Sequence, residues 1–178
     1  YQSIFSFEES YGYMIGNFVR DKDAVTASML IVEMACWYAA QGMTLFDALN
    51  ALYEKYGYYA EKTYNLVMPG LDGLAKMAKL MADLRAQPYT EIAGETVLQF
   101  KDYQDGSGTD LATGQKSTME LSGSNVLRFE LADGTSFIVR PSGTEPKIKV
   151  YILTSGQNRG EAAERVSRYG AFVQTMQA

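Results

Sequence analysis

The residues best suited to chemistry lie in a short loop between two predicted strands. Arg140 ends the first strand, and Ser142, Gly143 and Thr144 follow it. A planar guanidinium can form two parallel hydrogen bonds to a phosphate or carboxylate, and hydroxyls with consecutive backbone N–H groups can complete the shell around an anion. Lys149, on the strand after the loop, can add positive charge. We therefore expect this loop to bind a small anion.

A simpler interpretation also fits this loop. Turns rich in glycine, serine and threonine are common between strands, where Arg140 would form an ordinary surface salt bridge. The spacing does not match a P-loop, and the loop leads into a strand rather than a helix. The loop pattern alone leaves both an anion site and a structural turn open.

The composition restricts the possible partners. The net charge is −5 and no basic run occurs, so we expect no nucleic-acid binding. Cys36 is the single cysteine, which excludes a disulfide within the chain and favours a reducing, cytoplasmic compartment. It lies in the most apolar stretch, residues 24–40, which falls short of the roughly 20 residues that a membrane span needs. We expect a buried helix there, with Cys36 buried, and no membrane anchor.

The first third of the chain predicts two helices. Asp21 is expected to open the first helix, which is apolar on more than one side, and Gly42 to end it. Thr44 and Asp47 predict a capping box at the start of the second helix, and Gly57 predicts its end. The chain begins at a tyrosine rather than at methionine, which suggests a fragment.

The remainder predicts an antiparallel sheet that is closed by a helix. Apolar residues alternate at Leu127, Phe129 and Leu131 and again at Ile148, Val150 and Ile152, and they recur at helical spacing at Ala162, Val166, Tyr169, Val173 and Met176. Asp133 and Gly134 predict a hairpin turn. Residues 102–117 are rich in Asp, Gly, Ser and Thr and predict a long mobile loop. The fold class is therefore expected to be α+β.

Two stretches together resemble one enzyme family. "RPSGTEPKIKVYI", residues 140–152, is similar to the phosphate-binding loop of the α-D-phosphohexomutase superfamily, which contains the phosphoglucomutases and phosphomannomutases. "FEESYGYMIGNFVRDKDAV", residues 7–25, is similar to the sugar-recognition loop of that family. Phe7 stands where the family usually has Gly, and Tyr11 precedes Gly12; these departures resemble the branch that includes phosphopentomutases. The resemblance covers essentially the whole chain, as its C-terminal part.

The resemblance implies roles for both stretches. It implies that a phosphate that is not being transferred is bound by Arg140, Ser142, Gly143, Thr144 and Lys149. It implies that Glu8 and Ser10 hydrogen-bond sugar hydroxyls, and that Arg20 and Lys22 lie near the active-site cleft as substrate contacts.

The resemblance also implies a domain organisation. Residues 1–43 would be the end of the third domain of the family, the helical end of an α/β domain. Residues 44–178 would be the fourth domain, an antiparallel sheet packed by helices that is similar to the TATA-binding-protein fold.

The activity that the resemblance implies is that of an isomerase, an intramolecular phosphotransferase. Such enzymes interconvert hexose 1-phosphate and hexose 6-phosphate through a bisphosphorylated intermediate, with Mg²⁺ and a glucose 1,6-bisphosphate-type activator. The chain has no histidine for the Ser-His-Asn pattern of the serine loop and no D-x-D-x-[DR] run for magnesium. We therefore expect the phosphoserine and the metal ligands in upstream domains of the same chain, and expect these 178 residues alone to bind no cofactor and to be inactive.

A second class of function stays open, a stand-alone phospho-ligand binding module without catalysis. The missing catalytic motifs favour it. The apolar helix predicted at residues 24–40 argues against it, because an autonomous module would not leave such a helix half covered. The preferred sugar phosphate is not decided either, since Glu8 and Ser10 would contact hydroxyls that several sugars share.

Overall fold

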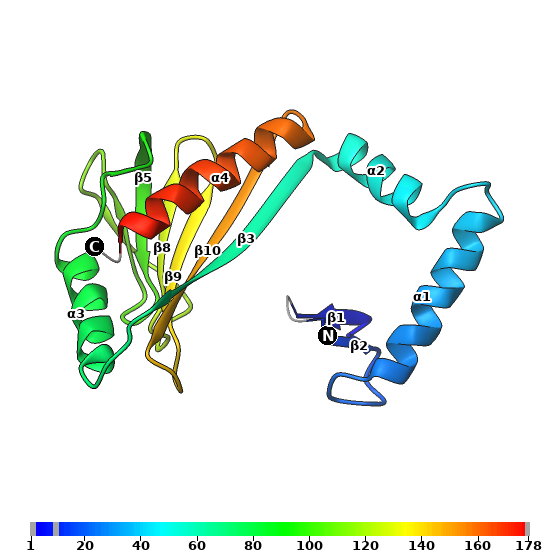
Figure 1. The fold of residues 1–178 in the computed structure, drawn as a ribbon, viewed down its shortest axis with the longest axis horizontal. Helices are drawn as coiled ribbons and strands as arrows, with labels where there is room; N and C mark the ends of the chain where they lie inside the picture. Colours follow the sequence, from blue (N-terminus) through cyan, green and yellow to red (C-terminus); the bar gives the residue numbers. More distant parts are fainter. Residues whose placement is uncertain (1–2, 9–10, 177–178) are drawn as a thin grey trace. The chain divides into compact units, whose positions relative to one another are not determined.

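The chain divides into two compact units, with the division between Tyr56 and Gly57. The computed structural model describes residues 3–8 and 11–176. The first unit contains β1 (Phe5–Phe7), β2 (Tyr13–Ile15), α1 (Ala24–Ala39) and α2 (Leu45–Tyr56), as Figure 1 shows. This division differs from the boundary that we expected between residues 43 and 44. The helix α2 belongs to the first unit, and Gly57, with φ +103°, marks the point where the chain leaves it.

The start of α2 has the capping box that the sequence predicts. The Thr44 N–H donates to Asp47 Oδ2 at 2.8 Å, and the Asp47 N–H donates to Thr44 Oγ1 at 3.1 Å. The two residues thus satisfy each other's backbone donors, which leaves fewer free N–H groups at this helix end.

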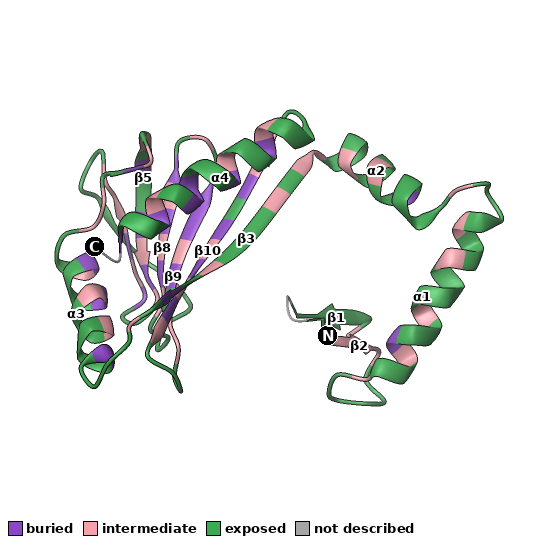
Figure 2. Ribbon diagram, in the orientation of Figure 1, coloured by how far each residue is buried: buried purple, intermediate pink, exposed green. Residues whose placement is uncertain are grey.

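The helix α1 is far more exposed than the sequence analysis expected. Its cap is Asp23, which accepts from Val25 N–H at 2.9 Å, and not Asp21. Figure 2 shows α1 as largely exposed. Its buried residue is Ala27, and its exposed large apolar side chains are Val25, Met29, Ile31, Val32, Met34 and Trp37. Cys36 is exposed as well. The expectation of a buried helix is wrong for the described residues. The strand β2 and the helix α2 make most of the contacts with α1, and they are too short to cover it.

The second unit is an antiparallel sheet with two long helices, so the predicted α+β class is confirmed. Its elements are β3 (Tyr58–Val67), α3 (Gly73–Ala86), β4 (Glu91–Ile92), β5 (Glu95–Asp102), β6 (Ser107–Asp110), β7 (Lys116–Thr118), β8 (Leu127–Leu131), β9 (Ser136–Pro141), β10 (Lys147–Gly156) and α4 (Arg159–Thr175). The strand order is β3-β10-β9-β8-β5-β6-β7, with β4 on β5. None of the helices in the described ranges has the length and apolar character to cross a bilayer.

The core of this unit lies on one face of the sheet. Ile148, Val150 and Ile152 of β10 are fully buried, as are Phe129 and Phe137 on the neighbouring strands. The helices α3 and α4 complete this core with Met81, Leu84, Val166, Tyr169, Val173 and Met176. The alternation and the helical spacing therefore predicted the core correctly. The opposite sheet face carries Lys149, Tyr151, Ile138 and Arg128, which are only partly buried.

The segment 102–117 is not the long mobile loop that its composition suggested. It contains β6 and the start of β7, which pair with each other, and β6 also pairs with β5. Its polar side chains shape the turns between these strands: Asp110 accepts from the Thr113 N–H at 2.8 Å, and Asp105 accepts from the Ser107 N–H at 2.8 Å. Asp, Ser and Thr favour tight turns and loops alike, so composition did not distinguish the two.

Asp133 connects the β8–β9 hairpin to α4. Its carboxylate accepts the Tyr169 hydroxyl at 2.6 Å, the Thr135 N–H at 2.9 Å and Arg168 Nη2 at 3.1 Å. Burial alone raises the pKa of Asp133, but the hydrogen bonds from Tyr169 and Thr135 outweigh burial, so the pKa lies below its ordinary value. Burial and then the hydrogen bond to Asp133 raise the pKa of Tyr169 to about 12.

Replacing Asp133 by asparagine is expected to lower the free energy of unfolding by about 2 kcal/mol at pH 7, because a charged acceptor of several hydrogen bonds is lost. Since the folded pKa of Asp133 is lowered, its contribution is complete above the ordinary aspartate pKa of about 3.9 and is lost as pH falls through the folded value. Urea unfolding of both proteins as a function of pH tests this. A difference in stability that stays constant down to acid pH would contradict it.

Candidate functional site

The predicted anion loop joins two paired strands, and its two flanking cations face each other. In the antiparallel register of β9 and β10, Arg140 lies directly opposite Lys149. Arg140 is exposed and Lys149 is half-buried. Neither side chain takes part in an ion pair with any residue that the structure describes. Like charges directly opposite on neighbouring strands destabilise a sheet, so an anion at this position would stabilise it.

The loop between these strands is short and internally bonded. The Ser142 N–H donates to the Lys147 carbonyl at 2.9 Å, and the Lys147 N–H donates to the Glu145 carbonyl at 2.7 Å. Thr144 N–H donates weakly to Ser142 Oγ at 3.4 Å. The space that a side chain at Gly143 would enter is open. Lys147 forms an ion pair with Glu145, so its charge is already balanced.

The far end of the loop is held by two other elements. The Met68 N–H, just after β3, donates to the Pro146 carbonyl at 2.8 Å. Gly73 begins α3 beside this contact, where a Cβ would lie 2.1 Å from the Met68 carbonyl oxygen and 3.0 Å from Pro146 Cβ. A side chain has no room there. Sequence reasoning did not predict this anchor, because a glycine at the start of a helix can occur for many different reasons.

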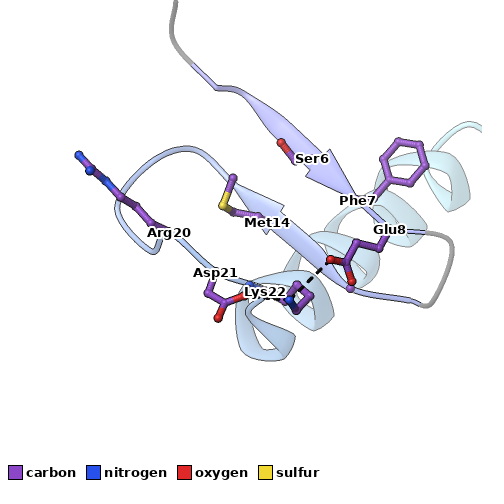
Figure 3. Close-up of a pocket in the computed structure, with 8 residues that line it drawn as sticks. Ser6, Phe7, Glu8, Met14, Arg20, Asp21 and Lys22 are labelled. Carbon is purple, nitrogen blue, oxygen red and sulfur yellow. Dashed lines mark hydrogen bonds and ion pairs between the residues drawn. The ribbon is translucent and has the colours of Figure 1, made fainter. Parts of the chain in front are cut away.

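A pocket of about 210 Å³ lies in the first unit, at the end of the β1–β2 hairpin (Figure 3). It is lined by Ser6, Phe7, Glu8, Gly12, Met14, Arg20, Asp21 and Lys22. In β1 and β2, Ser6 is opposite Met14 and Phe7 is opposite Tyr13. The pocket therefore has charged groups from the loops and an apolar contribution from the hairpin.

Three of the four predicted sugar contacts can be located. Lys22 Nζ lies 3.6 Å from Glu8 Oε1, so these two side chains come together. Arg20 lines the same pocket, but its guanidinium extends away from that pair (Figure 3). Ser10 lies outside the described residues. Sequence reasoning assigned Asp21 to the helix cap and missed that it contacts Lys22 Nζ at 3.1 Å.

The charges in this pocket support one another. A hydrogen bond from the Lys22 N–H, followed by one from its side chain, lowers the pKa of Asp21. The side-chain hydrogen bond to Asp21, followed by the charges of Asp21 and Glu8, raises the pKa of Lys22. Both groups are therefore charged at neutral pH, and the pocket offers a cationic donor beside carboxylate acceptors. Neutral hydroxyls are ligands that such a set can bind.

Carboxylates and the single cysteine are the possible metal-binding side chains of this chain, because its sequence has no histidine. Within residues 3–8 and 11–176, no group of three or more His, Cys, Asp and Glu side chains is arranged to hold a metal ion.

Replacing Gly73 by alanine is expected to lower the free energy of unfolding by about 1–3 kcal/mol, because the new Cβ overlaps the Met68 carbonyl. Since Pro146 touches the same position, we also expect the NMR amide shifts of Ser142 and Thr144 to change. Leu74→Ala is the matched control: it alters an exposed side chain in the same helical turn and should change stability by less than about 0.5 kcal/mol. Unaltered loop shifts in a folded Gly73→Ala protein would show that α3 does not hold the loop.

Comparison with known families assigns both units. Residues 65–166 match the family described as "Phosphoglucomutase/phosphomannomutase, C-terminal domain". Residues 2–56 match "Phosphoglucomutase/phosphomannomutase, alpha/beta/alpha domain III". The two matched ranges fall on either side of the division between the compact units. The first range contains the anion loop, and the second contains the pocket.

Individual relatives agree with this. The chain is 37% identical over 164 residues to a phosphoglucomutase of Staphylococcus aureus and 34% identical over 165 residues to one of Staphylococcus epidermidis. Each alignment covers 92% of the chain and 30% of the relative, so the chain spans less than a third of these proteins. Parafusin, a phosphoglucomutase from Paramecium, has a similar fold, with a TM-score of 0.52 and 16% identity over 95% of the chain and 30% of parafusin.

Proposed function

Because the chain belongs to the phosphoglucomutase/phosphomannomutase family, we propose that it forms the substrate-recognition part of a phosphohexomutase. The whole protein is an isomerase in this proposal, and it interconverts hexose 1-phosphate and hexose 6-phosphate through a bisphosphorylated intermediate of the glucose 1,6-bisphosphate type. Since the chain corresponds to 30% of the length of its relatives, the phosphoryl-transfer steps are assigned in this proposal to other domains of the same protein. The proposed location of the whole protein is the cytoplasm.

The observation that carries the proposal is the facing pair of Arg140 and Lys149 at the mouth of the loop. Two cations without a carboxylate partner among the described residues are unfavourable neighbours unless an anion joins them. Arg140 can bind two phosphate oxygens at once, and the Ser142 and Thr144 hydroxyls and the open backbone at Gly143 lie next in the chain. The two positive charges of Arg140 and Lys149 balance the charge of one phosphate dianion.

In this function the loop binds the phosphate that is not being transferred. Phosphoryl transfer depends mainly on positioning and on the stabilisation of charge, so a fixed distal phosphate contributes to catalysis without touching the reacting atoms. The bisphosphorylated intermediate must turn round between the two transfers, which presents each of its phosphates to the loop in turn. A loop that recognises phosphate alone, without reading the sugar, suits this requirement.

The pocket of the first unit is proposed to bind the sugar. Glu8 would accept a hydrogen bond from a ring hydroxyl, Lys22 would donate one, and Ser10 and Arg20 would complete the set as the family resemblance implies. The paired opposite charges leave little net charge toward the ring, which suits a neutral ring better than a second phosphate. Hydroxyls common to several sugars would be bound in this way.

The nucleophile and the metal are proposed to come from the parts of the protein outside this chain. The described residues offer no cluster of ligands for Mg²⁺, and the sequence has no histidine. The exposed apolar side chains of α1, Trp37 and Met29 among them, support a packing partner in the rest of an α/β/α domain. The chain thus corresponds to one of several parts that a complete active site requires.

Replacing Arg140 by alanine is expected to weaken binding of glucose 1-phosphate by on the order of tenfold or more, because charge-assisted hydrogen bonds are lost. Lys149→Ala should weaken binding of glucose 1-phosphate by about threefold. Without ligand, the same change should leave the free energy of unfolding unchanged or raise it by up to about 0.5 kcal/mol, because the repulsion between Lys149 and Arg140 is relieved. Calorimetric titration and thermal unfolding with and without ligand measure these effects. Lys116→Ala, at an exposed lysine of β7, is the control and should change neither.

The 178-residue chain by itself is expected to bind phosphosugars weakly and to interconvert none, because its sequence has no histidine for the Ser-His-Asn pattern of the serine loop that transfers the phosphate. A coupled assay with glucose 1-phosphate as substrate measures this. Turnover by the purified chain would overturn the assignment of the nucleophile to other domains. Tight binding by the chain, unchanged when the other domains are present, would instead favour a stand-alone phospho-ligand module.

A further inference from the structure

Lys22 is fixed at both of its ends by one neighbour. Asp21 Oδ1 accepts the Lys22 backbone N–H at 2.7 Å and lies 3.1 Å from Lys22 Nζ. Glu8 Oε1 lies 3.6 Å from the same Nζ. About half of the Lys22 side chain and half of the Glu8 side chain remain exposed, and a half-exposed lysine stays in one conformation only where its contacts outweigh the loss of rotamer freedom.

Gly12 leaves the space that the lysine stem occupies. A Cβ on Gly12 would lie 2.4 Å from Lys22 Cδ, 2.7 Å from Lys22 Cγ and 2.9 Å from Glu8 Oε2. The φ angle of Gly12 lies outside the left-handed region, in contrast to that of Tyr11 at +67°, so alanine can adopt the same backbone. The side chains of Lys22 and Glu8, rather than the backbone conformation, therefore require a glycine here.

We propose that Gly12 and Asp21 are positioning residues that hold the Lys22 ammonium beside the Glu8 carboxylate in the pocket. Gly12 admits the stem of the lysine, and Asp21 anchors its head. The pair can then accept a hydrogen bond from one sugar hydroxyl and donate one to its neighbour, a role that rests on the proposed function. The positioning itself does not depend on which ligand is bound.

The first test uses the pKa of Lys22, measured without any ligand, to report whether its ammonium group lies beside Asp21 and Glu8. An NMR titration of the Lys22 side chain in the 178-residue chain follows its pKa, which Asp21, and then Glu8, raises. Asp21→Asn should lower this pKa toward the ordinary lysine value, and Gly12→Ala should lower it too, because the new methyl group pushes the stem away from Glu8. Arg20, the other charge of the pocket, is unchanged in both proteins.

Asp47→Asn is the matched control for the titration. It removes another carboxylate of the same unit, one that binds Thr44 rather than Lys22, so the Lys22 pKa should stay where it is. Amide shifts of α1 report whether each variant keeps its fold. A Lys22 pKa that is the same in wild type, Gly12→Ala and Asp21→Asn would overturn the proposal.

The second test asks whether Gly12 acts through Lys22. Affinity for glucose 1-phosphate is measured for Gly12→Ala, Lys22→Ala and the double variant. Each single variant should weaken binding by up to about fivefold, as expected for a half-exposed charged contact. The double variant should bind like Lys22→Ala alone, because the stem that the methyl group displaces is already gone. Fully additive losses would mean that Gly12 acts through the backbone, against the proposal.

The two tests separate this inference from the proposed function. If the titration behaves as expected and the wild-type chain binds no phosphosugar, the positioning of Lys22 stands and the sugar-binding role fails. If phosphosugar binds and the titration is unaffected by both substitutions, the function stands and the positioning of Lys22 by Gly12 and Asp21 fails.

Discussion

The register between β9 and β10 is the constraint on which the second unit depends. Side chains alternate between the two faces of a strand, so the pairing that buries Ile148, Val150 and Ile152 in the core also sets Lys149 on the other face, opposite Arg140. A slip of one residue would bury the lysine and expose the isoleucines. The apolar core therefore keeps two like charges side by side, an arrangement that sheet stability alone would not favour.

The anion loop inherits its geometry from this register. The strands fix where the loop begins and ends, the contacts of Ser142 and Lys147 close it, and the Met68–Pro146 hydrogen bond ties its far end to β3. A loop that is already ordered loses little conformational freedom when it binds a ligand. In the proposed function, an acidic protein would bind a small anion in this way, because the positive charge is local and the scaffold rather than the overall charge keeps it in place.

The sequence predicted the elements whose side chains repeat with a clear period. The residues that alternate in the sequence, Leu127, Phe129 and Leu131, lie in the core, as predicted. The apolar residues at helical spacing that end at Met176 lie there too. The strands β6 and β7 were missed, because they are short and their residues are those of loops. The exposure of Cys36 was missed because periodicity tells which sides of a helix are apolar and not whether another element covers them.

The candidate sites show the same limit at the level of single residues. Arg140, Lys149, Glu8 and Lys22 could be proposed from the sequence because each carries a charge whose chemistry is visible there. Gly12 and Gly73 contribute by having no side chain, and their importance depends on atoms that reach them from Lys22 and from Met68. A residue that acts by leaving room has no chemical signature of its own. Both glycines govern the position of charged or polar groups, so the space they leave is part of how the two sites are built.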